Sequence, residues 1–254
     1  MKNTLYAAAA VASNSFRESV RNRFFTLFAV FAFTSIYASV LAGVMAVDQE
    51  GRVLADMGLA LIELTALAYA LFSASSSLLK EAETKTIYLV FSRPVPRWSY
   101  LAGKLAGVLL TSAFMLAVMG LMHLLLLSFR GFGVPPFYAW ALGGSFLKLA
   151  VITSFAFFVS LFSTSPVSTL VISGILWTLG HFVPETRFLA DQAGGLKGTA
   201  LNAAVWLIPN LQLFNARDVS GSACVLGAPA FVSAAAWVGG SYLAALWLLR
   251  RKEF

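Results

Sequence analysis

Two histidines, six methionines and one cysteine are the side chains of this 254-residue chain that could bind a soft metal. Thioether and imidazole groups are ligands that suit copper. Methionine also fills gaps between helices, however, and histidine also bonds a neighbouring carbonyl. No spacing between these residues fixes a ligand set, so the structural interpretation is favoured and no metal ligand is assigned. The candidates are Met119, Met122, His123 and His181, with Met45, Met57 and Cys224 expected on the same side of the chain.

Two charged residues, Glu63 and Lys148, lie inside otherwise apolar stretches. Ionisable residues at membrane depth usually face a cavity or a partner. The carboxylate and the ammonium group could pair with each other, or they could line a substrate path. A structural contact and a transport role are both compatible with the sequence, and the two interpretations stay open.

A polar connection at residues 80–104 reads KEAETKTIYLVFSRPVPRWSYLAGK. Glu81 and Glu83 are expected in the first turn of a short helix, where the helix dipole favours carboxylates. Pro94 and Pro96 would end that helix and stiffen its exit. A stiff amphipathic helix suits docking against a soluble protein. The alternative is a basic loop that only maintains the topology.

The elements that must position these residues are membrane helices. Apolar residues make up 59% of the chain and charged residues 11%, whereas about a quarter of a soluble domain is charged. A chain with so few polar residues must be surrounded by lipid over much of its surface. No polar stretch is long enough for a second domain, so residues 1–254 are expected to be one domain. Apolar stretches predict an all-α fold with six transmembrane helices at 24–47, 57–79, 105–129, 138–162, 167–183 and 225–249.

Two further helices are expected outside the spans. Residues 1–23 carry an apolar stripe, which predicts an amphipathic helix along the membrane surface. The stripe consists of Leu5, Ala9, Ala12, Phe16 and Val20. The stretch Leu201–Phe214 is too short to cross and contains Pro209, so it is expected as a re-entrant or interfacial helix within an outer segment at 185–218.

The basic residues predict the orientation. With six spans both termini share a side, which carries twelve of the 18 Lys and Arg residues; the opposite side carries five, and Lys148 is the remaining one. The positive-inside rule then places both termini in the cytoplasm and the chain in the inner membrane. The formal net charge of +7 does not indicate nucleic acid, because the basic residues form no patch with interleaved aromatic residues.

The order of residues in several segments resembles the ABC-2 permease family. The connection carries Glu81, Glu83 and Thr86, then Phe91-Ser92-Arg93-Pro94-Val95 and Arg97, then Gly103-Lys104. Before the first span, Phe16-Arg17-Glu18 and Val20-Arg21-Asn22-Arg23-Phe24 are similar to the family's elbow helix. Ile208-Pro209-Asn210 with Phe214 and the basic end at 250–254 are also similar. Within the family, the likeness is closest to the subgroup of multicopper-enzyme maturation, such as the nitrous-oxide reductase maturation permease.

This resemblance implies a type V exporter fold with a coupling helix in 80–104 that docks on a cytosolic ABC ATPase dimer. It further implies export, a homodimer of two permease copies, a periplasmic accessory protein and a role in metalloenzyme maturation. ATP and Mg would be bound by the partner ATPase, because Gly103-Lys104 lacks the flanking residues of a phosphate-binding loop. No cofactor is expected on this chain. The implied coupling residues are Glu81, Glu83, Thr84, Thr86, Arg93, Pro94, Arg97 and Lys104, and the implied elbow residues are Arg17, Glu18, Arg21 and Arg23.

Other functions share part of this pattern. A non-transporting membrane scaffold of an assembly complex has the same composition and differs only in whether ATP turnover moves a substrate. A haem subunit needs histidine pairs on facing helices, and His123 and His181 are the only histidines. A membrane enzyme would need a cluster of catalytic side chains, and none is visible. The permease is therefore the first hypothesis and the scaffold is the alternative.

Overall fold

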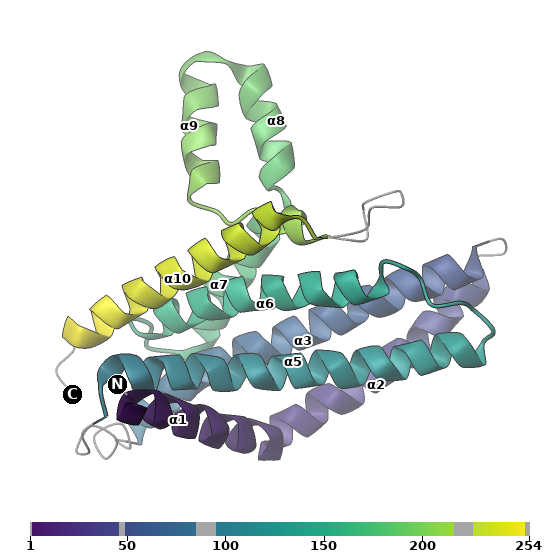
Figure 1. The fold of residues 1–254 in the computed structure, drawn as a ribbon. Coiled ribbons are helices and arrows are strands. Elements are labelled where there is room, and N and C mark those ends of the chain that lie inside the picture. Colours follow the sequence, from purple (N-terminus) through teal and green to yellow (C-terminus); the bar gives the residue numbers. More distant parts are fainter. Residues whose placement is uncertain (1, 46–48, 85–94, 216–225, 252–254) are drawn as a thin grey trace.

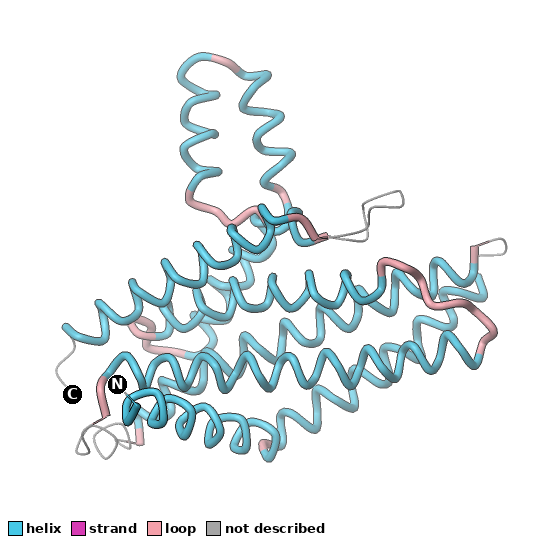
Figure 2. Tube along the Cα trace, viewed as in Figure 1, coloured by secondary structure: helices cyan, strands magenta, loops and turns pink. Residues whose placement is uncertain are grey.

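The computed structural model describes residues 2–45, 49–84, 95–215 and 226–251, and the elements within these ranges are all helices (Figures 1 and 2). The all-α prediction is confirmed over this part of the chain. The elements are α1 (Lys2–Arg21), α2 (Arg23–Met45), α3 (Glu50–Glu83), α5 (Arg97–Phe129), α6 (Tyr138–Ser160), α7 (Pro166–His181), α8 (Val183–Ala193), α9 (Gly195–Trp206), the 3₁₀ helix η1 (Leu211–Phe214) and α10 (Ala228–Arg251).

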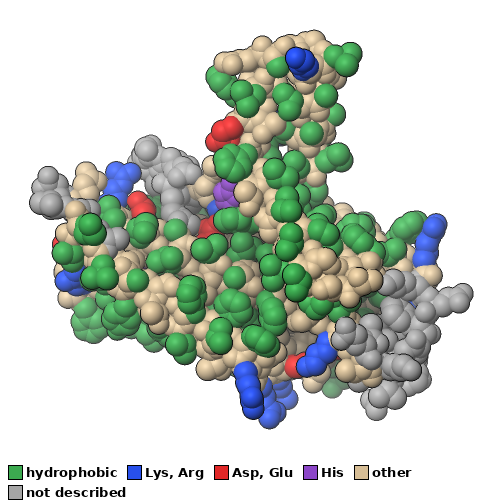
Figure 3. Space-filling model, turned by 180° about the vertical axis from the view of Figure 1, so that it is seen from behind, with side chains coloured by type: hydrophobic (Ala, Val, Ile, Leu, Met, Phe, Trp, Pro, Cys, Tyr) green, Lys and Arg blue, Asp and Glu red, His purple; other side chains and the backbone are tan. Residues whose placement is uncertain are grey.

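Five of these helices, α2, α3, α5, α6 and α10, are long and apolar enough to cross a membrane. Helix α7 has 16 residues and meets α8 at a bend of 60°, and the two together are a sixth candidate span. Hydrophobic side chains are distributed over the bundle in the face of Figure 3, whereas most Lys and Arg side chains lie toward its margins. The chain is therefore a multi-pass membrane protein.

The break between α6 and α7 has a local cause at Pro166, where the sequence predicts one. Proline disfavours helix in the residue before it but fits the first turn of a new helix. Ser165 adopts an extended conformation, and its Oγ accepts a hydrogen bond of 3.3 Å from the backbone N–H of Val167. Helix α6 ends at Ser160, and the pair Ser165-Pro166 begins the next helix.

Helices α3 and α5 extend beyond the predicted spans, with 34 and 33 residues respectively. At about 1.5 Å per residue each is about 50 Å long, well beyond the ~30 Å of the hydrocarbon core. The expectation that Glu81 and Glu83 begin a separate helix is wrong, because they lie in the last turn of α3. Arg97 and Lys104, expected in a loop, belong to the first turns of α5.

Helix α3 occupies the centre of the bundle and packs against α2, α5, α6 and α7. Helix α10 packs on α6, and α1 packs along α5. The beginnings of α1 and α5 and the ends of α3 and α10 lie together at one end of the bundle (Figure 1). This end contains the flanks of residues 85–94, which lie outside the described residues.

Helices α8 and α9 form a hairpin that projects away from the bundle (Figure 1). Its turn is made by Gly194 and Gly195, whose φ angles of +57° and +53° lie in the left-handed region that glycine adopts without steric cost. The expectation of one helix at Leu201–Phe214 is wrong: α9 ends at Trp206, and η1 is separate. Pro209 lies between them and lacks the N–H that a continuous helix would need there.

Candidate functional site

Helix α1 lies against the first half of α5 through small residues. A Cβ atom on Gly103 would lie 2.7 Å from the carbonyl oxygen of Ala8, and one on Gly107 would lie 2.4 Å from Cβ of Ser15. Glycine therefore permits the two backbones to approach closely, as in other packed membrane helices. Ser99 Oγ also donates a hydrogen bond of 2.7 Å to the Thr4 carbonyl.

The buried face of α1 differs from the predicted stripe. Ala12 and Ser15 are buried against α5, whereas Leu5 and Ala9 of the stripe are exposed. Two larger side chains of α1 also face α5: Val11 lies against Gly103, and the Phe16 ring centroid is 6.1 Å from that of Phe114.

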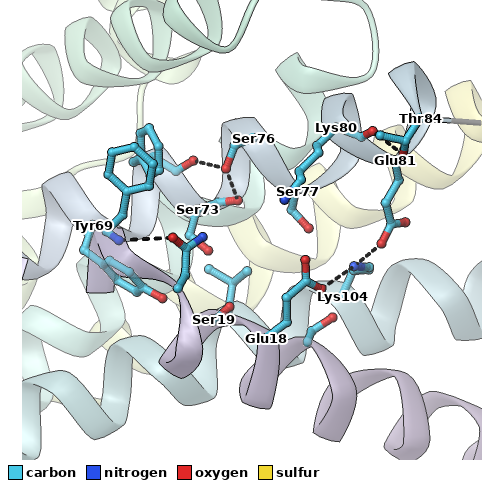
Figure 4. Close-up of a pocket in the computed structure, with 15 residues that line it drawn as sticks. Glu18, Ser19, Tyr69, Ser73, Ser76, Ser77, Lys80, Glu81, Thr84 and Lys104 are labelled. Carbon is cyan, nitrogen blue, oxygen red and sulfur yellow. Dashed lines mark hydrogen bonds and ion pairs between the residues drawn. The ribbon is translucent and has the colours of Figure 1, made fainter. Parts of the chain in front are cut away.

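A charged junction joins the ends of α1, α3 and α5 (Figure 4). It consists of Glu18, Glu81, Tyr100 and Lys104. The Lys104 ammonium group forms an ion pair with Glu81 and lies 4.0 Å from Glu18 Oε2, and the Tyr100 hydroxyl donates a hydrogen bond to Glu81. The Lys104 side chain is only 5% exposed. Removing one partner of so buried a pair leaves an uncompensated charge, which is strongly destabilising.

A cavity of about 420 Å³ adjoins the charged junction. Its wall is rich in hydroxyl groups, and Figure 4 shows serines of α1 and α3 around the same space. Within the described part of the chain, the buried Oγ of Ser15 has no hydrogen-bond partner. The cavity therefore offers polar groups to a bound molecule. The serines are Ser15, Ser19, Ser73, Ser76 and Ser77.

Arg97 attaches the start of α5 to the end of α10. Its Nη1 donates hydrogen bonds of 2.9 Å to the carbonyl oxygens of Leu249 and Arg250. The last carbonyls of a helix lack partners within the helix, and an arginine satisfies them well. About two turns earlier in α10, the Tyr242 hydroxyl donates a hydrogen bond of 2.8 Å to the Trp98 carbonyl. The residues after segment 85–94 are thus fixed to α10.

A second polar cluster lies within the candidate spans, where Lys148 Nζ is 2.8 Å from Glu63 Oε1. Both side chains are buried, and Ser145 Oγ donates a hydrogen bond of 2.7 Å to Glu63 Oε2. Lys148 also donates to Asn215 Oδ1 and lies 3.4 Å from His181 Nε2. The two intramembrane charges therefore pair, which is one of the arrangements open from the sequence.

His181 Nδ1 lies 2.9 Å from the Trp177 carbonyl oxygen. Because a carbonyl only accepts, Nδ1 must carry the proton, and Nε2 is left to accept from Lys148. This cluster, which we call the ion-pair cluster, comprises Glu63, Ser145, Lys148, His181 and Asn215. All of these residues except Ser145 line a cavity of about 330 Å³ between α3, α6 and α7.

His123 lies apart from the ion-pair cluster, in the contact between α3, α5 and α6. Its Nδ1 is 2.9 Å from the Tyr138 hydroxyl, and its Nε2 is 3.3 Å from the Leu54 carbonyl oxygen. Among the described residues, no group of three or more His, Cys, Asp or Glu side chains could hold a metal ion. The two histidines therefore form hydrogen bonds in separate places. Of the two candidate methionines nearby in sequence, Met119 is buried and Met122 is 41% exposed.

The structure brings together only some of the predicted coupling and elbow residues. Glu18, Glu81 and Lys104 meet, whereas Thr84 Oγ1 bonds within its own helix turn, to the Lys80 carbonyl at 2.7 Å. The side chains of Arg17, Arg21 and Arg23 are exposed, and Thr86, Arg93, Pro94 and Cys224 lie outside the described residues.

Sequence reasoning missed Tyr100, Asn215 and Trp177, which contribute polar groups to these sites. A tyrosine, an asparagine or a tryptophan in a largely apolar chain carries no spacing signal. Their positions in the sites result from contacts between distant helices.

A comparison with family models matches residues 9–190 to the family described as ABC-2 family transporter protein. The matched region contains the charged junction and, except for Asn215, the ion-pair cluster. No curated protein matches the chain.

Proposed function

Because the chain belongs to the ABC-2 transporter family, we propose that it is the membrane-spanning permease subunit of an ABC transporter, driven by a separate cytosolic ATPase. The observation that carries this proposal is that side-chain contacts hold the residues on both sides of segment 85–94 in place. On one flank, Glu81 at the end of α3 pairs with Lys104. On the other flank, Arg97 holds the end of α10.

The proposed mechanism follows from these attachments. An ATPase that docks on residues 80–104 would displace the ends of α3 and α5 together, and the charged junction would transfer the displacement to α1, the elbow helix. Hydrolysis changes the membrane conformation only if the docked ATPase favours one state over another. Because the buried charges must stay paired in both states, the joined helix ends would move as one unit, and the docked ATPase would favour one position of this unit over another.

The orientation and assembly complete the proposal. We place both termini and the charged junction in the cytoplasm of the inner membrane, in line with the positive-inside rule. Two copies of the chain would form the transport unit, with an ATPase dimer on its cytoplasmic side and an accessory protein in the periplasm. The direction of transport would be export. The resemblance of the 80–104 connection supports a role in metalloenzyme maturation, which the identity of the neighbouring genes would test.

Reversal of the Glu81 charge tests the coupling. In liposomes that contain the permease and its ABC ATPase, Glu81→Lys should reduce permease-dependent stimulation of ATP hydrolysis about tenfold, the effect of losing about 1.4 kcal/mol of interaction. The double variant Glu81→Lys with Lys104→Glu restores opposite charges and should recover much of the stimulation.

A matched control lies at the opposite end of the bundle, where Arg130 Nη2 is 2.9 Å from Glu50 Oε1. Glu50→Lys also removes an ion pair between α3 and α5, a more exposed one, and should leave ATPase stimulation unchanged. Equal losses in Glu81→Lys and Glu50→Lys would mean that the charged junction has no special part in coupling. If no ABC ATPase binds the permease, the proposed function fails and the scaffold alternative replaces it.

A further inference from the structure

Three cavities follow one another along α3. The first is the serine-lined cavity at the charged junction, and the third is the cavity of the ion-pair cluster. Between them, a cavity of about 590 Å³ lies between α3 and α7. Neighbouring cavities share lining residues: Phe72 lines the first and second, and Leu64 and Trp177 line the second and third.

The α3 residues that line the cavities include six positions, spaced four residues apart, that turn gradually around the helix because four residues make slightly more than one turn. They are Ala60, Leu64, Ala68, Phe72, Ser76 and Lys80. From Glu63 to Glu81, at 1.5 Å per residue, the lining residues extend about 27 Å along α3. That distance is close to the ~30 Å thickness of the hydrocarbon core. The three cavities therefore extend along α3 over a distance close to the thickness of a membrane.

The chemistry of the lining changes twice along α3. The first cavity is lined by hydroxyl and charged groups, the second almost entirely by apolar side chains, and the third by the ion-pair cluster. Aromatic rings separate the first two: Phe72 packs against Phe24, with ring centroids 4.4 Å apart, and against Phe28, at 6.4 Å. Phe24 lines the first cavity and Phe28 lines the second.

An unused hydrogen-bond donor marks the boundary between the second and third cavities. The Trp177 indole N–H is buried and has no hydrogen-bond partner among the described residues. A buried donor without a partner is costly, and a ligand that accepts its hydrogen bond removes that cost. A polar group held at the ion-pair cluster would lie next to this indole, because Trp177 lines that cavity too.

The charges define the polar group further. Glu63 and Lys148 neutralise each other, so a head group with a net charge of either sign would meet a like charge at close range. A head group without net charge that carries both signs complements the pair. The adjoining apolar cavity extends from Leu64 to Phe72, about 12 Å along α3, and suits an alkyl chain or ring system.

We propose that the three cavities form one path for an amphipathic molecule with a zwitterionic head group. In its bound position the head group contacts the ion-pair cluster and accepts from Trp177, while the apolar part occupies the cavity between α3 and α7. This inference names a substrate class and rests on the proposed permease function, with the charged junction at the entrance of the first cavity.

Photolabelling of the permease alone tests the binding position. The probe is lysophosphatidylcholine with a diazirine in its acyl chain, and the protein is held in nanodiscs of phosphatidylglycerol, so that the host lipid carries no zwitterionic head group. Labelled peptides should map to residues 64–72 of α3 and 170–179 of α7, and the labelling should saturate. Labelling that does not saturate and is as strong on α10 would overturn the proposal, because it would indicate bulk lipid.

Two glycine variants provide the matched comparison. A Cβ atom on either Gly174 or Gly239 meets nothing within 4 Å, so a leucine fits at both positions. Gly174 lines the apolar cavity, whereas Gly239 lines none of the three. Gly174→Leu should reduce labelling about tenfold, because several methylene groups of the probe lose their apolar burial, and Gly239→Leu should not. An equal effect of the two variants contradicts the assigned position.

Competitors with the same chain test the head group. Unlabelled lysophosphatidylcholine should displace the probe at lower concentration than an alkyl sulfate or an alkyl trimethylammonium. Equal competition by all three would overturn the zwitterionic assignment. The labelling experiment contains no ATPase, so its result does not depend on coupling. If the probe labels the permease but no ABC ATPase binds the permease, only the proposed function fails. Absent labelling with intact ATPase stimulation counts against this inference alone.

Discussion

At the residue scale, Lys148 holds the ion-pair cluster together. Its ammonium group contacts Glu63, Asn215 and His181, from three different parts of the chain. Lys148→Met should lower the free energy of unfolding by about 3–5 kcal/mol, because the Glu63 carboxylate is then buried without its counter-charge. Thermal unfolding in detergent micelles measures the loss.

The double variant Glu63→Gln with Lys148→Met is the control for that prediction. It removes both charges, so it should be more stable than Lys148→Met alone. A double variant at least as unstable as the single one would show that the packing of the lysine stem, and not the charge, accounts for the loss.

At the element scale, the contact between α1 and α5 depends on glycine. Gly107→Val would place a branched side chain where Cβ of Ser15 and the Ala12 carbonyl already lie, at 2.4 and 3.0 Å from the glycine's missing Cβ. We expect α1 to separate from α5, which exposes the backbone around Arg17 and Arg21. Small residues at such contacts set the distance between helices. Trypsin should therefore cleave after these arginines several times faster in the variant than in the unchanged protein.

Gly239→Val in α10 is the matched control for Gly107→Val, since the space around Gly239 is open. It changes a helix glycine by the same amount but should leave the rate of tryptic cleavage in α1 unaltered. Faster cleavage in both variants would point to general destabilisation and would contradict the proposed role of Gly107.

Helix boundaries show what the sequence could and could not predict. The end of α6 and the start of α7 lie near Pro166 and were predicted within a few residues. The ends of α3 and the start of α5 were not, because a charge in sequence suggests the end of a span. Lys104 is nevertheless buried, and it finds its partner Glu81 only when two helices pack together.

The candidate sites divide in the same way. Glu63 and Lys148 stood out because each is a charge in an apolar stretch, and the structure pairs them. Asn215 and Trp177 could not be predicted: their roles result from the fold of η1 and α7 against α3 and α6, which no local pattern records. The cavities along α3 likewise exist only because α3 lies at the centre of the bundle.

At the scale of the whole molecule, the orientation in the membrane can be measured. Cys224 is the only cysteine, so Cys224→Ser provides a background for single labels. Ser13 on α1 and Thr199 on α9 are both exposed. With both termini in the cytoplasm, a membrane-impermeant maleimide should label Thr199→Cys in intact cells and Ser13→Cys only after lysis. The reverse pattern would invert the topology and remove the docking site from the cytoplasm.

The bonds from Arg97 to the last carbonyls of α10 have a practical consequence for how the protein is handled. The last turn of α10 is hydrogen-bonded to the start of α5, although more than 150 positions separate Arg97 from Arg250 along the chain. Truncation before Leu249 would therefore deprive the beginning of α5 of its anchor. Purification tags belong at another site, or behind a linker that leaves this turn intact.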